Sequence, residues 1–195
     1  MALELLIFFA LFFMAAFFWP TWRLWKRERV KALVLAYDDT AHGLVAKWFR
    51  ATLIGIFVML AAILAGLPAS AMGPLQWIEG EIARSAGWAL LALSLLWVIA
   101  AQAQMGSSWR IGIDGGTRAP LVTTGLFAIS RNPIFLGMRA SLLGLFLVLP
   151  NAFSLAILIA GEILIQVQVR LEERHLSTAH HAEFQRYRAA VRRWL

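Results

Sequence analysis

The chain contains no cysteine, so neither a disulfide nor a thiolate metal site can form. Charge is also scarce, since Asp, Glu, Lys and Arg make up 15% of the 195 residues and apolar residues make up 61%. An average soluble domain is only about 45–50% apolar. This excess and a mean hydropathy of +0.71 predict an integral membrane protein. The length predicts a single membrane domain over residues 1–195.

Acidic residues are the scarcer charge, with 11 Asp and Glu against 18 Lys and Arg and a net charge of +7. The basic residues lie in short segments between apolar runs, an arrangement that suits anionic lipid headgroups better than nucleic acid. We therefore expect no nucleic-acid partner. The first apolar run lacks a positive leader and a small-residue cleavage site, so we expect a retained helix rather than a signal peptide.

Five apolar runs have the length of membrane helices. Each would extend about 25–27 Å at 1.5 Å per residue, slightly short of a bilayer core. Pro150-Asn151 separates the last two runs and is typical of a tight turn, so these two should form a helical hairpin. The predicted fold is all-α, with membrane helices at about residues 2–19, 51–67, 87–103, 133–149 and 152–169.

Lys and Arg residues predict the orientation of these helices. They are frequent after the first, third and fifth runs, whereas the loop after the second run carries Arg84 alone. The positive-inside rule then places the N-terminus outside and the C-terminus in the cytoplasm. Residues 21–50 mix tryptophans with basic residues and predict an amphipathic helix on the inner surface. Phe184, Tyr187, Val191 and Leu195 recur at helical spacing and predict a last helix that packs back over this membrane face.

Two charged residues, Arg139 and Glu162, interrupt the last two apolar runs. They lie equally far from the Pro150-Asn151 turn, at a depth of about 17 Å, so the hairpin should bring them together as a buried ion pair. Two interpretations stay open. The pair either only holds the hairpin together or faces a substrate.

A third polar feature, Arg131-Asn132-Pro133, opens the fourth run. Proline suits the first turn of a helix, and the Asn132 side chain should cap that turn by accepting from backbone N–H groups. A helix start beside an arginine also suits a carboxylate or a phosphate. Four amides should lie toward the same side of the membrane, where they either join helices or line a pocket: Gln102, Gln104, Gln166 and Gln168.

Adjacent carboxylates, Glu172 and Glu173, follow the fifth run, where the helix dipole opposes them. They are either an exposed charged turn or a site for a cationic or hydroxyl-bearing ligand. Other site signatures are missing. The glycines of the loop 106–123 form neither a P-loop nor a dinucleotide fingerprint, and His175, His180 and His181 lack a metalloprotease pattern, so we predict no metal site.

Two motifs frame the C-terminal half of the chain. The first is Leu121-Val-Thr-Thr-Gly-Leu-Phe127 followed by Arg131-Asn-Pro-Ile-Phe-Leu-Gly137, and Met105-Gly-Ser-Ser-Trp-Arg110 leads into it. The second is Glu172-Glu173 with Leu176, then Glu183-Phe184 with Tyr187, Val191 and Arg193. In order, spacing and placement around a hairpin, these motifs resemble the isoprenylcysteine carboxyl methyltransferase and phospholipid methyltransferase superfamily.

This resemblance implies an integral membrane methyltransferase that binds S-adenosylmethionine at its cytoplasmic face, within about residues 102–195. If the acceptor is an amine or thiol, Glu173 would remove its proton; if it is a carboxylate, Arg193 or Arg139 would orient it. Asn132 and Phe135 replace the histidine and tyrosine usual in prenylcysteine enzymes and weigh against that substrate. The residues implied at the cofactor are Gln102, Trp109, Arg131, Asn132, Pro133, Phe135, Gly137, Glu172, Glu173 and Tyr187.

The acceptor expected from this resemblance is a lipid or another amphiphile that enters from the membrane. Anionic lipid headgroups are the other expected partner. Two alternatives stay open: a non-catalytic membrane scaffold or transporter subunit, and a membrane reductase of the same architecture that binds a nicotinamide cofactor. An arginine-rich, cysteine-free membrane chain without targeting signals favours a prokaryotic plasma membrane.

Overall fold

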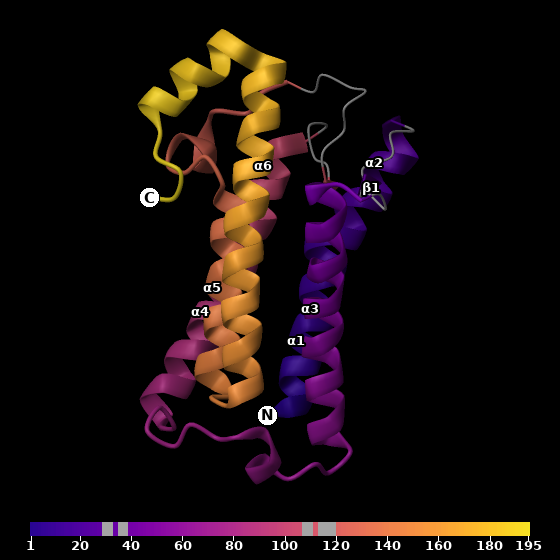
Figure 1. The fold of residues 1–195 in the computed structure, drawn as a ribbon, viewed down its shortest axis with the longest axis vertical. Coiled ribbons are helices and arrows are strands. Elements are labelled where there is room, and N and C mark those ends of the chain that lie inside the picture. The colour runs from indigo at the N-terminus through magenta and orange to yellow at the C-terminus, as the bar shows by residue number, and fades with distance from the viewer. Residues whose placement is uncertain (29–32, 35–38, 107–110, 113–119) are drawn as a thin grey trace.

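The computed structural model describes residues 1–28, 33–34, 39–106, 111–112 and 120–195 as a bundle of long helices (Figure 1). The first helix is continuous but contains one π-helical stretch. Beyond the helices, strands β1 (Leu33–Val34) and β2 (Ile111–Gly112) make a two-residue parallel pair. The predicted all-α fold is confirmed. The helices are α1 (Ala2–Phe13), the π-helix Met14–Phe18, α2 (Trp19–Glu28), α3 (Ala41–Leu64), α4 (Glu81–Met105), α5 (Pro133–Val148) and α6 (Ala152–Ala190).

Four of the described helices are long and apolar enough to cross a membrane, and α5 is a shorter apolar helix of 16 residues. All five predicted apolar runs are helical, and the chain is an integral membrane protein. At 1.5 Å per residue α5 extends about 24 Å, so it falls slightly short of a bilayer core. The four long candidates are Ala2–Lys26, Ala41–Leu64, Glu81–Met105 and Ala152–Ala190.

The segment 21–50 differs from its prediction. A single amphipathic helix there is wrong, because its first part continues the first helix as α2 and its last part begins α3 at Ala41. Thr40 caps α3 by accepting from the Gly43 N–H (3.2 Å), which explains the early start. Helix α2 has an amphipathic character, because the rings of Trp22 and Trp25 are exposed and the Lys26 ammonium lies 5.0 Å from the Trp22 ring centre.

Helices α4 and α5 approach closely because glycines lie at their interface. A Cβ atom on Gly137 would stand 2.4 Å from Cγ2 of Val98, and one on Gly144 would stand 2.8 Å from Cγ of Leu91. Small residues allow such close approach of helix backbones in membranes. The start of α5 is thereby fixed against the end of α4.

The α5–α6 hairpin forms as predicted. Asn151 accepts from the Ser154 N–H (2.9 Å), and the Ser154 hydroxyl accepts from the Asn151 N–H (3.1 Å), so the turn is closed by a reciprocal cap. Up to the turn at His181, α6 extends about 43 Å at 1.5 Å per residue, longer than a bilayer core of about 30 Å, so its outer end stands beyond the membrane. At His181 (φ 20°, ψ −97°) the chain turns, and the last helical stretch folds back over the bundle end (Figure 1).

The predicted apolar stripe of this last stretch is partly confirmed. Phe184 and Tyr187 are buried, whereas Leu195 is exposed because the helix ends at Ala190 and the chain becomes extended at Val191. Beneath it lies a buried apolar cluster contributed by the first helix, α4, residues 125–128 and α5. The buried members of this cluster are Phe12, Ala16, Leu24, Val98, Ala101, Phe127 and Ile134.

Replacing Gly137 by alanine should lower the midpoint of thermal unfolding in detergent, because the new methyl group overlaps Val98. Overpacking of this kind costs roughly 1–3 kcal/mol. Gly55→Ala is the matched control, since no atom lies within 4 Å of its added Cβ. Equal midpoints for the two variants would contradict the close packing of α4 on α5.

Candidate functional site

The candidate site centres on Glu173 of α6, which is held between two arginines. Arg131, just before α5, donates from Nη2 (3.0 Å) and Nε (3.2 Å) to Oε1 of Glu173. Arg193, from the C-terminal segment Val191–Leu195, donates from Nη2 to Oε2 (2.7 Å). The side chains of Arg131 and Glu173 are 8% and 9% exposed. Three parts of the chain distant in sequence therefore meet at one buried carboxylate. Glu173 and its hydrogen-bond donors Arg131, Asn132 and Arg193 are called the Glu173 network below.

The C-terminal segment is fixed to the start of α5 by further hydrogen bonds. The Arg131 N–H donates to the Arg192 carbonyl (3.0 Å), and the Ser130 hydroxyl donates to the Arg193 carbonyl (3.2 Å). Nη1 of Arg131 donates to the Arg188 carbonyl (3.2 Å) and to that of Val191. All three guanidinium nitrogens of Arg131 thus donate within the protein, which opposes its expected contact with a ligand carboxylate.

Asn132 does not cap α5 with its side chain, contrary to the prediction. Its amide nitrogen instead donates to Oε1 of Glu173 (3.4 Å) and to the Arg193 carbonyl (3.3 Å). The Glu173 carboxylate and the Arg193 carbonyl accept hydrogen bonds from the Asn132 side chain and so hold it away from the N–H groups of α5. The first backbone N–H groups of α5 consequently have no side-chain cap.

The protonation of Glu173 follows from these partners. Burial by itself would raise its pKa, but the hydrogen bond from Arg193 and the charge of Arg131 outweigh burial and hold the pKa below its usual value. Glu173 in turn raises the pKa of Arg193. A carboxylate with a lowered pKa is a weak base, so these surroundings do not favour the proton-removing role expected of Glu173.

Glu172, the neighbouring carboxylate, has the opposite surroundings. It is partly buried, and no residue in the described part of the chain forms a hydrogen bond or ion pair with it. Burial, followed by the charge of Glu173, raises its pKa to about 7. Of the two adjacent carboxylates, Glu172 is therefore the one free to meet a ligand or a proton.

Tyr187, also predicted at the cofactor, closes the site from above. Its hydroxyl donates to the Phe127 carbonyl (2.6 Å), and its ring packs edge-on to Phe184. Burial raises the pKa of Tyr187 to about 12. Tyr187 therefore joins the last helical stretch to residues 125–128 and stays protonated.

The remaining predicted site residues fall into two groups. Phe135 is partly buried in the first turn of α5, next to the site. Pro133 and Gly137 serve packing, since the Pro133 carbonyl accepts from Nε1 of Trp97 (2.8 Å) and Gly137 contacts Val98. Trp109 lies outside the described residues.

The amides of α4 join helices. Gln102 donates to the Ala16 carbonyl in the π-helical stretch, and Gln104 accepts from the Leu126 N–H (2.7 Å). The interpretation as helix links fits both residues, and Gln102 points to the first helix, away from the Glu173 network. Among the described residues no group of three or more His, Cys, Asp and Glu side chains is placed to hold a metal.

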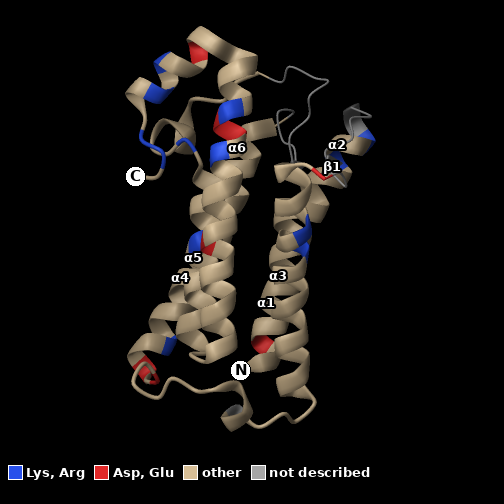
Figure 2. Ribbon diagram, viewed as in Figure 1, with Lys and Arg blue, Asp and Glu red and all other residues tan. Residues whose placement is uncertain are grey.

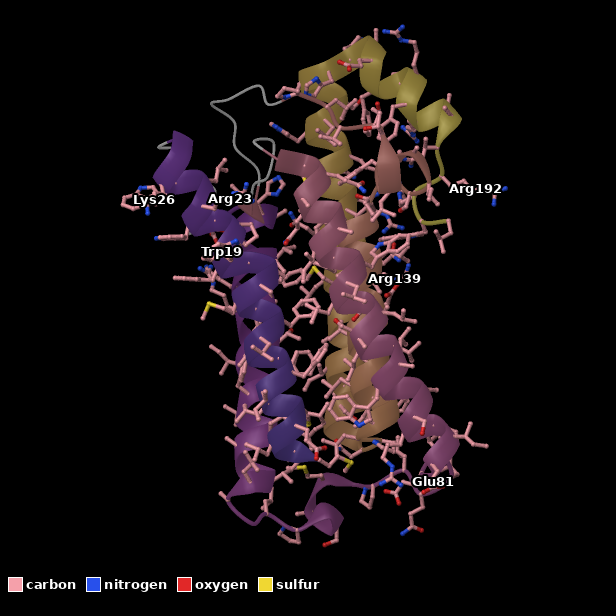
Figure 3. The ribbon with its side chains drawn as sticks, turned by 180° about the vertical axis from the view of Figure 1, so that it is seen from behind. Trp19, Arg23, Lys26, Glu81, Arg139 and Arg192 are labelled. Atoms are coloured by element: carbon pink, nitrogen blue, oxygen red, sulfur yellow. The ribbon has the colours of Figure 1, made fainter. Side chains whose placement is uncertain are left out.

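The ion pair across the hairpin is confirmed, with Nε of Arg139 2.7 Å from Oε2 of Glu162. The expectation that it is buried is wrong, since the two side chains are 30% and 36% exposed. Trp194 lies over the Arg139 guanidinium, 4.4 Å from Cζ to the ring centre. Figure 3 shows Arg139 at the side of the bundle, below the segment that carries Arg192.

Three residues that shape this region were not predicted from the sequence: Ser130, Trp97 and Trp194. Ser130 is fully buried and bonds to the C-terminal segment, yet it precedes the arginine of the motif and looks like an ordinary loop residue. In the sequence, Trp97 and Trp194 look like the aromatic residues that are common at the membrane–water interface. The position of Trp194 one residue after Arg193 was the available signal.

A model of the phospholipid methyltransferase family matches residues 82–183. This match covers more than half of the chain, from the start of α4 to the residue before Phe184. No curated protein and no solved structure matches the chain.

Replacing Glu173 by glutamine should destabilise the protein and change how its stability depends on pH. Because the folded-state pKa of Glu173 lies below the usual 4.5, its stabilising contribution is complete above pH 4.5 and is lost as the pH falls through the folded-state value. Breaking a buried pair costs roughly 3–5 kcal/mol. Thermal unfolding below and above pH 4.5 should show a weaker acid dependence in Glu173→Gln than in the wild type.

The control for this prediction is Glu79→Gln, an exposed residue at the other end of the bundle. It should keep the wild-type acid dependence. Parallel curves for Glu173→Gln and the wild type would show that the Glu173 network contributes nothing to folding.

Proposed function

The chain belongs to the phospholipid methyltransferase family and is therefore a membrane methyltransferase, and we propose that S-adenosylmethionine is its methyl donor. The proposed acceptor is a lipid or another amphiphile. One juxtaposition supports the donor: Glu172, a carboxylate without a partner in the described chain, lies one residue from the network that holds the uncapped start of α5.

The polar groups of this region fit S-adenosylmethionine. Its carboxylate suits the free N–H groups in the first turn of α5, where the helix dipole favours an anion. Its ammonium or ribose hydroxyls suit Glu172. Phe135, in the same turn, offers an aromatic surface for a cation or for the adenine. Arg131 is assigned a positioning role, because its donors already contact Glu173 and two carbonyls.

S-adenosylmethionine supplies an activated methyl group when it is bound. The work left to the protein is to orient donor and acceptor and to exclude water. The Glu173 network would orient donor and acceptor, because it fixes α5, α6 and the C-terminal segment to one another. Tyr187 and Phe184 would exclude water, because their buried aromatic rings cover the region.

The acceptor determines whether a proton must be removed. A carboxylate acceptor needs no base, whereas an amine needs one with a pKa near the working pH. Glu172, with its pKa raised to about 7, suits this role, and Glu173, with its lowered pKa, does not. We therefore assign proton acceptance to Glu172 in place of Glu173, in a complex in which Glu172 contacts the ribose hydroxyls of the donor, because pairing with the ammonium would lower its pKa and make it a weaker base.

The apolar part of the acceptor would have to reach the site from the membrane. A small apolar cavity of about 40 Å³ lies between the pair α1–α3 and the hairpin α5–α6. Its walls carry mainly aromatic and aliphatic side chains. Among the residues that line it are Phe13, Phe49, Leu142 and Ile165. We propose that an acyl chain enters here.

The charge distribution supports a site at the cytoplasmic face, with the N-terminus outside. Figure 2 shows Lys and Arg gathered at the end of the bundle that carries the Glu173 network. The exposed Trp19, Trp22 and Trp25 of α2, with Lys26 over Trp22, suit anionic headgroups at this surface. A prokaryotic plasma membrane is the proposed location.

Calorimetry on detergent-purified protein tests the donor. The wild type should bind S-adenosylmethionine saturably, and binding should strengthen as the pH rises through about 7, where Glu172 ionises. Glu172→Gln should weaken binding at least about tenfold and remove this pH dependence, because a hydrogen bond to a charged group contributes roughly 1.5–3 kcal/mol. Glu79→Gln, exposed at the far end, serves as the control.

Two results would contradict the proposal. A folded wild type that binds no S-adenosylmethionine would favour a scaffold or transporter subunit. Displacement of bound S-adenosylmethionine by NADPH would favour a reductase.

A further inference from the structure

The Arg139–Glu162 pair is costly where it lies. Arg139 is about 9 Å along α5 from its start at 1.5 Å per residue, within the apolar part of the hairpin. Charges at such a depth usually face a protein interior or a water-filled cavity. Here both side chains keep about a third of their surface exposed on the side of the bundle (Figure 3). A polar partner from outside the protein would remove this cost.

The hydrogen bonds show what kind of partner is missing. Glu162 accepts from Arg139 at Oε2 and from Gln166 at Oε1 (2.8 Å), and Gln166 accepts from Nη1 of Arg170 (3.0 Å). Arg139 uses only Nε, and no acceptor in the described chain meets its two terminal nitrogens. The carboxylate of Glu162 and the amide oxygen of Gln166 are thus occupied, while the two terminal nitrogens of Arg139 are free. An anion is the partner that these nitrogens lack.

We propose that Arg139 and Trp194 form a phosphate subsite for a membrane phospholipid. Glu162 holds Nε and the Trp194 ring covers the guanidinium, so the edge with two terminal nitrogens is presented for a bidentate bond to a phosphate. Arg170 lies two helical turns beyond Glu162 toward the Glu173 network and adds a second positive charge.

The subsite is continuous with the candidate site. Trp194 follows Arg193, which binds Glu173, so one short segment contacts both. The inference rests on the proposed function in one respect: the lipid held here would be the methyl acceptor. Arg139 and Trp194 would then determine specificity by favouring lipids that carry a phosphate over neutral lipids with the same chains.

Native mass spectrometry of detergent-purified full-length protein tests this subsite. The probes are phosphatidylethanolamine and a diacylglycerol with the same acyl chains. The wild type should bind the phospholipid about tenfold more tightly, the factor expected for a charged hydrogen bond. Because Arg139→Gln alone would strand Glu162, the test variant is the double replacement Arg139→Gln with Glu162→Gln, which keeps a hydrogen-bonding pair. It should lose the preference for the phospholipid.

Two further variants sharpen the result. Trp194→Leu leaves the ion pair in place and should lose part of the preference. Arg84→Gln, an exposed arginine at the opposite end of the bundle, should keep all of it. An equal preference in the wild type and the double variant would overturn the subsite. Loss of the preference in saturating inorganic phosphate would support the subsite, since the free ion would then compete with the lipid phosphate for Arg139.

Calorimetry with S-adenosylmethionine on the same variants separates this inference from the proposed function. Intact donor binding with a lost phospholipid preference supports the subsite. A wild type that prefers phospholipid but binds no donor would overturn the proposed function and leave the subsite standing. Intact donor binding without any preference in the wild type would overturn the subsite alone.

Discussion

The buried carboxylate of Glu173 is the interaction on which this end of the molecule depends. An ionised side chain withdrawn from water is tolerated only when its partners replace the lost hydration. Arg131, Asn132 and Arg193 supply those partners from two other parts of the chain. The requirement to satisfy one charge therefore fixes the start of α5, the outer half of α6 and the C-terminal segment in a single arrangement.

Two adjacent glutamates have different chemistry here because they lie on different sides of a helix. Glu173 faces the arginines and stays ionised, whereas Glu172 lacks such partners and titrates near neutral pH. A single residue step along a helix turns a side chain by about 100°. This rotation directs Glu173 toward the arginines that it holds in place and leaves Glu172 available to a ligand.

Features that one helix or one turn determines could be predicted from the sequence. The hairpin and the Arg139–Glu162 contact follow from equal distances to Pro150-Asn151, and the helices follow from apolar runs. Side-chain contacts for which a distant segment competes could not be predicted. Asn132 has the sequence of a cap, but a carboxylate 41 residues later and the Arg193 carbonyl take its amide. Nothing local distinguishes Glu172 from Glu173 before the path of the C-terminal segment is known.

The length of α6 has a mechanical consequence. One helix runs from the far membrane boundary to the Glu173 network, and the network ties it to α5, so the hairpin moves as a stiff lever. A bilayer thinner than its apolar length is accommodated by tilting. Helix α6 packs along α3, so a tilt of the hairpin would act on the walls of the apolar cavity between them. A change in bilayer thickness would therefore reach the membrane-embedded side of this bundle through a single stiff element.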